Sequence, residues 1–187
     1  MKKNIITIAG SIGSGKSSTA KAIASALGYQ HFSSGDLFRQ IAAERNMSVE
    51  AINALTVEER NEIDQHVDGM LRDMSTGGNL VIDSRLAFHW IPDSFKLFLC
   101  VDPETAAERI FAQILGEGRI SQSGSSIEEI QAATETRTKQ ETSRYQALYG
   151  VNIYDVSQFD AMFHTGKNDL PTVAAMALAA FRAWHQN

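Results

Sequence analysis

Short β-favouring runs alternate with longer amphipathic segments along the chain. The runs lie at 5–9, 29–33, 80–82, 95–101 and 159–164. Between them, apolar residues recur every three or four positions, as at Ile63, Val67, Met70 or Leu71, and Met74. Strands that alternate with helices in this way form a parallel sheet covered on both faces. The pattern predicts an α/β fold in which helices flank a five-stranded parallel sheet.

Capping residues and glycines mark the ends of the predicted helices. Thr56 and Glu59, and again Ser126 and Glu129, have the spacing of a capping box. The second box opens a long helix that ends at Gly150. On the helix after Thr56, four polar residues lie off the apolar stripe and are expected on a solvated face: Asp64, Gln65, His66 and Asp68. The glycine- and serine-rich stretch at 115–126 is expected to be a mobile lid.

Composition narrows the class of protein. The 187 residues suit one domain, and 43% of them are hydrophobic, enough for a folded core. The net charge of −5 disfavours nucleic acid or an anionic membrane as a partner. No apolar run approaches the roughly 18 residues of a membrane span, and the chain begins without a signal peptide. We expect a cytoplasmic protein, and the sequence fits a monomer or a homodimer equally.

The first strand runs into a glycine-rich turn and then a helix that ends at Gly28. The turn fits the phosphate-binding pattern G-x-x-x-x-G-K-[ST] from Gly10 to Ser17. Its glycines let the backbone approach phosphate oxygens, and its amides point toward them at a helix N-terminus. Lys16 can neutralise the β- and γ-phosphates, and Ser17 can bind Mg²⁺. The predicted ATP-binding residues are Gly10, Ser11, Ile12, Gly13, Ser14, Gly15, Lys16, Ser17 and Ser18.

The long helix carries charged residues within an otherwise inward-facing stripe. The stripe consists of Ile127, Ile130, Thr134, Arg137, Glu141, Arg144 and Leu148, spaced alternately three and four apart. Buried charges are costly unless they are paired or bind an opposite charge. Two arginines against one glutamate leave an excess that a phosphate can neutralise. A structural ion-pair network, or exposure of the middle of the helix, explains the pattern equally well.

Three further residues are candidates for nucleotide contacts. Arg85 follows a buried strand, where a guanidinium can grip a phosphate with two hydrogen bonds. Asp83 precedes it and can hold Mg²⁺ directly or through water, although a surface ion pair between the two is the alternative. Arg39 on the predicted helix at 36–45 is the third candidate, although an arginine at such a position usually just faces solvent. Phe88 and Trp90 are expected in the core rather than against a base.

Several segments resemble those of nucleoside monophosphate kinases. They are the phosphate loop, residues 31–39 (HFSSGDLFR), 43–48 (AERNMS) and 83–87 (DSRLA). Residues 106–110 (AAERI) and 143–151 (SRYQALYGV) are similar to the short, archaeal-type cytidylate kinases. The resemblance extends from residue 4 to about 184. It implies a P-loop NTPase fold in one domain, with a helical nucleotide-acceptor segment at about 34–76 and a short lid at 115–126.

The resemblance also implies a set of acceptor-binding residues. The residues expected to bind the acceptor nucleotide are Ser34, Gly35, Arg39, Arg85, Arg137, Glu141 and Arg144. The residues expected to hold Mg²⁺ are Ser17 and Asp83. The catalytic residues are Lys16, Arg85, Arg137 and Arg144. The family usually has glycine where Ser84 stands and glutamate where Asp83 stands. It also has a basic residue one turn after Arg109, where this chain has Ala112 and Gln113; Arg119 is expected to substitute.

The implied reaction transfers a phosphoryl group from ATP to CMP or dCMP, with Mg²⁺ as cofactor. The attacking phosphate oxygen is already anionic, so catalysis requires positioning and charge stabilisation rather than a general base. A second hypothesis is a kinase for another nucleotide or for a hydroxyl compound, with Asp36 or Asp83 as the base. A third is a nucleotide sensor without catalysis, which the altered lid suggests.

Overall fold

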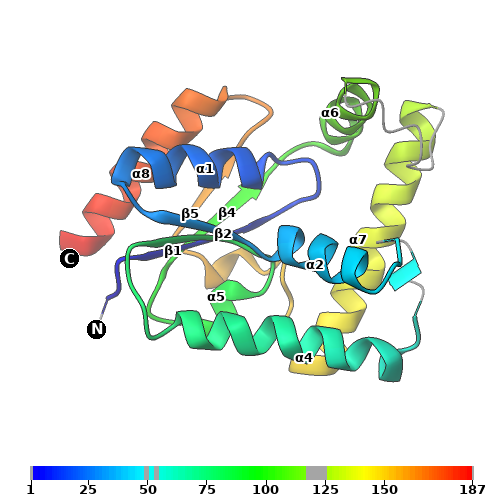
Figure 1. The fold of residues 1–187 in the computed structure, drawn as a ribbon. Helices are drawn as coiled ribbons and strands as arrows, with labels where there is room; N and C mark the ends of the chain where they lie inside the picture. Colours follow the sequence, from blue (N-terminus) through cyan, green and yellow to red (C-terminus); the bar gives the residue numbers. More distant parts are fainter. Residues whose placement is uncertain (1, 49–50, 53–54, 117–125, 187) are drawn as a thin grey trace.

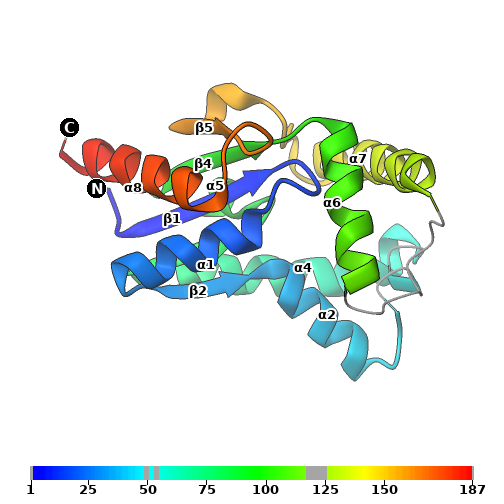
Figure 2. The same ribbon diagram turned by 90° about the horizontal axis from the view of Figure 1, so that it is seen from above.

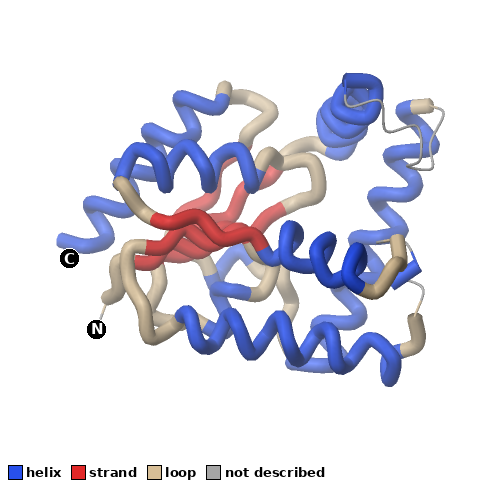
Figure 3. The backbone as a smooth tube through the Cα atoms, in the orientation of Figure 1, coloured by secondary structure: helices blue, strands red, loops and turns tan. Residues whose placement is uncertain are grey.

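The computed structural model describes residues 2–48, 51–52, 55–116 and 126–186. Five strands form one sheet: β1 (Ile5–Gly10), β2 (Gln30–Ser33), β3 (Leu80–Asp83), β4 (Phe95–Cys100) and β5 (Ala161–His164). Their order is β2-β3-β1-β4-β5, and every pair is parallel. Figure 3 shows the strands at the centre, with helices on both sides. The predicted five-stranded parallel sheet is confirmed.

Helices cover both faces of the sheet (Figure 1). On one face lie α1 (Lys16–Leu27) and α8 (Leu170–Gln186). On the other lie α4 (Val57–Met74) and the short α5 (Ala87–Trp90). Beyond the carboxyl ends of the strands lie α2 (Ser34–Glu44), α6 (Pro103–Gly116) and α7 (Ile127–Tyr149). A 3₁₀ turn at Val156–Gln158 precedes β5.

The central strand β1 supplies apolar side chains to both faces. Ile6 and Ile8 pack in one core cluster with residues of α1 and α8. Ile5 packs in a different cluster with Leu71 of α4. Successive side chains of a strand point to opposite faces, so a strand covered on both sides needs apolar residues throughout. This explains why β1 is apolar from Ile5 to Ala9 except for the β-branched Thr7, whose buried hydroxyl is hydrogen-bonded to Ser94.

Predicted helix ends agree with the structure where residues are described. The Ser33 and Ser126 hydroxyls accept hydrogen bonds from the third amide of their helices, Asp36 N at 3.2 Å and Glu129 N at 3.3 Å. Gly150 ends α7 with a φ of 67°, a conformation that favours glycine. Helix α2 begins at Ser34, two residues before the predicted start. The glutamate side chain of the first capping box, Glu59, lies outside the described residues.

Two predictions about helix faces are wrong. Asp68 is buried rather than solvated, and the Asp64 side chain is only 14% exposed, because a second face of α4 packs against α5 and α7. On α7, Leu148 is 37% exposed, and the neighbouring Tyr145 and Tyr149 pack into the core instead. Arg137 is also half exposed, at 48%. Gln65 and His66 are exposed as predicted.

Helices α2, α6 and α7 extend past the same end of the sheet as the phosphate loop (Figure 2). Ligands of parallel α/β sheets bind at this end. Most of the predicted lid, residues 117–125, lies outside the described residues, as does Arg119. Within the described part of the chain, every helix is too short or too polar to cross a bilayer.

Candidate functional site

The phosphate loop joins β1 to α1 in a conformation that depends on its glycines. Gly10 has a φ of 146°, and a Cβ added there would lie 2.0 Å from the carbonyl oxygen of Leu99. Gly13 and Gly15 have φ values of 76° and 77°. Helix α1 begins at Lys16, so the amides of its first turn have no carbonyl partner within the helix. The loop therefore presents amides to an anion.

Lys16 folds back over this loop. Its Nζ donates to the carbonyl oxygens of Gly10 at 3.1 Å and Ser11 at 2.7 Å. Burial and, secondly, the positive charge of Arg85 lower its pKa to about 7. Lys16 and Arg85, which are far apart in the sequence, thus lie close together. The negative charges around them do not fully compensate their positive charges. An anion bound here would restore the charge of the lysine.

Ser17 and Asp83 form a pair of oxygen ligands beside the loop. The Ser17 hydroxyl donates to Oδ2 of Asp83, which lies at the buried carboxyl end of β3. No group of three or more His, Cys, Asp or Glu residues suitable for a metal occurs in the described ranges. Mg²⁺ binds through one or two protein oxygens, phosphate oxygens and water. Ser17 and Asp83 therefore fit Mg²⁺ that is shared with a nucleotide.

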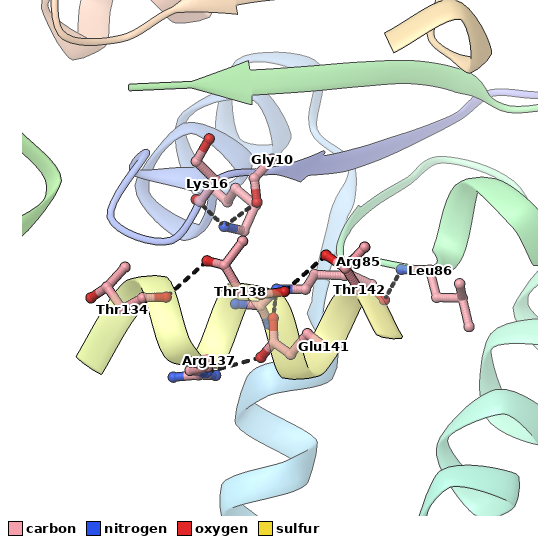
Figure 4. A network of polar contacts seen from close by, with 11 residues as sticks. Gly10, Lys16, Arg85, Leu86, Thr134, Arg137, Thr138, Glu141 and Thr142 are labelled. Atoms are coloured by element: carbon pink, nitrogen blue, oxygen red, sulfur yellow. Dashed lines mark hydrogen bonds and ion pairs between the residues drawn. The ribbon is translucent and has the colours of Figure 1, made fainter. Parts of the chain in front are cut away.

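The other predicted cations meet around one carboxylate. Nε of Arg85 lies 2.8 Å from Oε2 of Glu141, and Nε of Arg137 lies 2.9 Å from Oε1. Figure 4 shows Arg85 near Lys16, with Glu141 next to it and Arg137 on the far side of Glu141. Burial lowers the pKa of Arg85, but Glu141 and other nearby groups, among them Asp83, together outweigh that effect and the pKa is raised. Two arginines and one glutamate leave this group with a net positive charge.

Arg144 belongs to a second charged group on the same helix. Its Nη1 lies 3.4 Å from Oδ2 of Asp64, and Nε of Arg60 lies 3.5 Å from Oδ1 of the same carboxylate. All three side chains are less than a fifth exposed. Nε of Arg144 has no hydrogen-bond partner among the described residues. It is a buried donor that these residues leave unsatisfied.

A single pocket contains both charged groups. The predicted acceptor residues that line it are Ser34, Gly35, Arg39, Arg85, Arg137, Glu141 and Arg144. Ser34 is held by a hydrogen bond of 3.3 Å from its hydroxyl to the Asp83 carbonyl. Arg39 lies at the margin, 56% exposed and paired with Asp36. Within the loop, Ser14 is buried and Ser18 is exposed, while Ser11 and Ile12 border a separate apolar pocket against α6 and α7.

The structure adds pocket residues that the sequence reasoning missed. They are Phe38, Arg60, Asp64, Val67, Asp68, Leu71, Tyr145 and Tyr149. Asp68 accepts a hydrogen bond of 3.1 Å from Trp90 Nε1 and another from the Tyr149 hydroxyl. Burial raises the pKa of Asp68. The spacing of Arg60, Asp64 and Asp68 could have indicated part of this set, because it places three charges on one side of a helix.

Comparisons with known proteins found similar sequences over nearly the whole chain. A family model described as an AAA domain matches residues 9–131. A cytidylate kinase of Methanothrix thermoacetophila is 35% identical over 179 residues, covering 96% of this chain and 98% of the relative. A cytidylate kinase of Haloarcula marismortui is 33% identical over 184 residues, covering 96% and 90%. The chain belongs to the cytidylate kinase family. The resemblance inferred from the sequence is therefore confirmed.

Solved structures place the fold of this cytidylate kinase family member among P-loop kinases. A shikimate kinase from Bacteroides thetaiotaomicron superposes with a TM-score of 0.60 at 14% identity, covering 98% of both chains. At that identity the likeness concerns the fold alone. The P-loop NTPase fold predicted from the resemblance is confirmed.

One departure from the family pattern has a local structural explanation. Ser84 stands where the family usually has glycine, and it is buried. Its hydroxyl accepts a hydrogen bond of 3.3 Å from the amide of Leu86. This bond fixes the turn that carries Arg85 from β3 into α5. Ser84 thus supports the turn from which Arg85 reaches Glu141.

Proposed function

We propose that this protein transfers the γ-phosphoryl group of ATP to CMP or dCMP. The observation that carries the proposal is that Arg85, which lines the acceptor pocket, lies near Lys16 of the phosphate loop (Figure 4). The phosphate loop and the cationic pocket therefore adjoin each other. The relatives named cytidylate kinase supply the acceptor.

In this proposal the phosphate loop holds ATP, with Lys16 on its β- and γ-phosphates. The acceptor phosphate binds between Arg85, Arg137 and Arg144, and Ser34, Gly35 and Arg39 contact the acceptor nucleotide from α2. Glu141 orients two of these arginines through its ion pairs. Ser17 and Asp83 would hold Mg²⁺, which supplies positive charge to the phosphates of the donor. The substrates are nucleotides of the cytoplasm, and we place the protein there.

The chemistry requires no general base. An anionic oxygen of the CMP phosphate forms a bond to the γ-phosphorus of ATP, and the bond to the β-γ bridging oxygen breaks to release ADP. Charge that develops on the transferred group and the leaving oxygen is stabilised by Lys16 and the arginines. Holding both nucleotides in line removes much of the entropic barrier. Helices at 34–76 and the lid at 115–126 would close over them and exclude water.

The test is nucleotide-dependent release of ADP. Purified protein is mixed with ATP, Mg²⁺ and one acceptor at a time: CMP, dCMP, UMP, AMP, or a hydroxyl compound such as shikimate. We expect the highest kcat/KM with CMP or dCMP and formation of the diphosphate. Preference for a hydroxyl acceptor would overturn the proposal, and so would tight ATP binding without turnover of any acceptor.

A further inference from the structure

The acceptor pocket has a charged end and an aromatic end on helix α7. Glu141, with its partners Arg85 and Arg137, lies at the charged end. Tyr145 and Tyr149, one and two helical turns later, lie at the aromatic end. Eight residues of helix span ~12 Å, close to the length of a nucleoside monophosphate. With the acceptor phosphate at the arginines, as the proposed function requires, the base extends toward Tyr149.

Apolar side chains from three helices surround the aromatic end. Phe38 comes from α2, Val67 and Leu71 from α4, and Tyr145 and Tyr149 from α7. Ligand pockets of this kind hold a flat ring by apolar contact and fix its identity with a few polar groups. The carboxylate of Asp68 is such a polar group here.

Asp68 can accept further hydrogen bonds. It is 6% exposed, and Trp90 and Tyr149 each donate one hydrogen bond to it. An ionised carboxylate offers about four acceptor positions, so about two are available to a ligand. Among the described residues, Asp68 forms no ion pair, unlike Asp64, which is shared by Arg60 and Arg144. A buried acceptor of this kind favours a ligand that donates hydrogen bonds.

We propose that Asp68 selects the acceptor base by accepting a hydrogen bond from the exocyclic amino group of cytosine. This inference rests on the proposed function. Cytosine carries an amino donor where uracil carries a carbonyl oxygen, and that oxygen would face the carboxylate with no proton between them. A site built to bind a donor rejects an analogue without it, because its buried polar group is then left unpaired. Asp68 thus discriminates CMP from UMP.

The test compares kcat/KM for CMP and UMP in the wild type, Asp68→Asn and Asp73→Asn. The amide keeps an oxygen for Trp90 and adds N–H groups that can donate to a uracil carbonyl. We expect Asp68→Asn to lower the CMP-to-UMP ratio by at least ~10-fold. Asp73 is exposed on the same helix, so its variant is the matched control and should keep the wild-type ratio. An unchanged ratio in folded Asp68→Asn would overturn the inference.

A substrate analogue tests the same contact without changing the protein. In the 4-deoxy analogue of CMP, hydrogen replaces the amino group. We expect the wild type to use it at least ~10-fold less efficiently than CMP; equal use would overturn the inference even if Asp68→Asn does not fold. If the wild type turns over CMP but the ratio and the analogue do not behave as expected, the inference about Asp68 is wrong and the proposed function is unaffected. A wild type inactive on CMP contradicts the proposed function itself.

Discussion

Nε of Arg85 lies 2.8 Å from Oε2 of Glu141, which joins the end of strand β3 to the middle of helix α7. The two residues are far apart in the sequence, and both side chains are mostly buried, at 21% and 14% exposure. The ion pair fixes the guanidinium near the phosphate loop. Glu141 also pairs with Arg137, so one carboxylate orients two cations of the acceptor pocket.

Replacing Glu141 by glutamine should destabilise the protein. The substitution leaves Arg85 as a mostly buried, uncompensated charge, and breaking such a pair costs about 3 kcal/mol. The partner Arg137 is half exposed and adds little. We expect the free energy of unfolding, measured with urea, to fall by about that amount. Glu135→Gln, at an exposed position of the same helix, should have a much smaller effect.

The stability difference between wild type and Glu141→Gln should depend on pH. Burial raises the pKa of Glu141, but Arg85 and Arg137 outweigh that effect and the pKa is lowered. A carboxylate with a lowered pKa stabilises the folded state above its unfolded pKa, and this contribution is lost as pH falls through the folded pKa. We expect the difference to hold down to about pH 4.3 and to shrink below it. A constant difference at lower pH would contradict this.

Replacing Arg137 by alanine separates a catalytic role from a structural one. Because its side chain is 48% exposed, its loss should leave the melting temperature nearly unchanged. If it stabilises charge on the transferred phosphoryl group, kcat should fall by on the order of 10²-fold. Arg182→Ala, at an exposed position on α8, is the control and should keep full activity. Normal turnover with a lowered melting temperature would favour the structural role.

ATP binding should be accompanied by proton uptake at Lys16. With a pKa of about 7 in the free protein, this lysine is largely neutral at pH 8. The phosphates of ATP favour its charged form, so binding at pH 8 should take up ~0.9 proton. Calorimetry in two buffers with different ionisation enthalpies measures this number. Lys16→Met should abolish the uptake; equal uptake in that variant would assign it to another group.

Replacing Ser17 by alanine should weaken the binding of Mg²⁺ to a measurable degree. The change removes one of two proposed oxygen ligands and leaves Asp83 in place. We expect the Mg²⁺ concentration for half-maximal activity to rise by on the order of 10-fold. Ser25→Ala, exposed further along the same helix, is the control. An unchanged Mg²⁺ dependence would exclude the Ser17 hydroxyl as a ligand.

The sheet and the phosphate loop could be predicted because their signals are local. The apolar run of β1 reflects burial on both faces, and the glycine at position 10 reflects a carbonyl 2.0 Å from where its Cβ would be. Capping by Ser126 and termination at Gly150 are likewise local, and both are observed. Interactions within a few residues determine such features, so a single sequence carries them.

The aromatic end of the pocket could not be predicted because it depends on how three helices pack. Periodicity identified the apolar face of α4, where Leu71 packs with Ile5 and Ile82 of the sheet and Ile63 packs in a separate cluster with residues of α2. It did not show that α7 and Trp90 cover a second face, where Asp68 is buried. On α7 the same limitation assigned Leu148 to the interior in place of Tyr149. Only tertiary contacts distinguish these choices.

The central claim is that the phosphate loop and the acceptor pocket form one continuous site for two nucleotides. Its most direct test is the affinity of a molecule in which adenosine and cytidine are joined through five phosphates, measured by calorimetry with Mg²⁺. A molecule that fills both halves loses its translational freedom once, so it should bind at least ~10²-fold more tightly than ATP or CMP alone. Binding no tighter than that of ATP would contradict the claim.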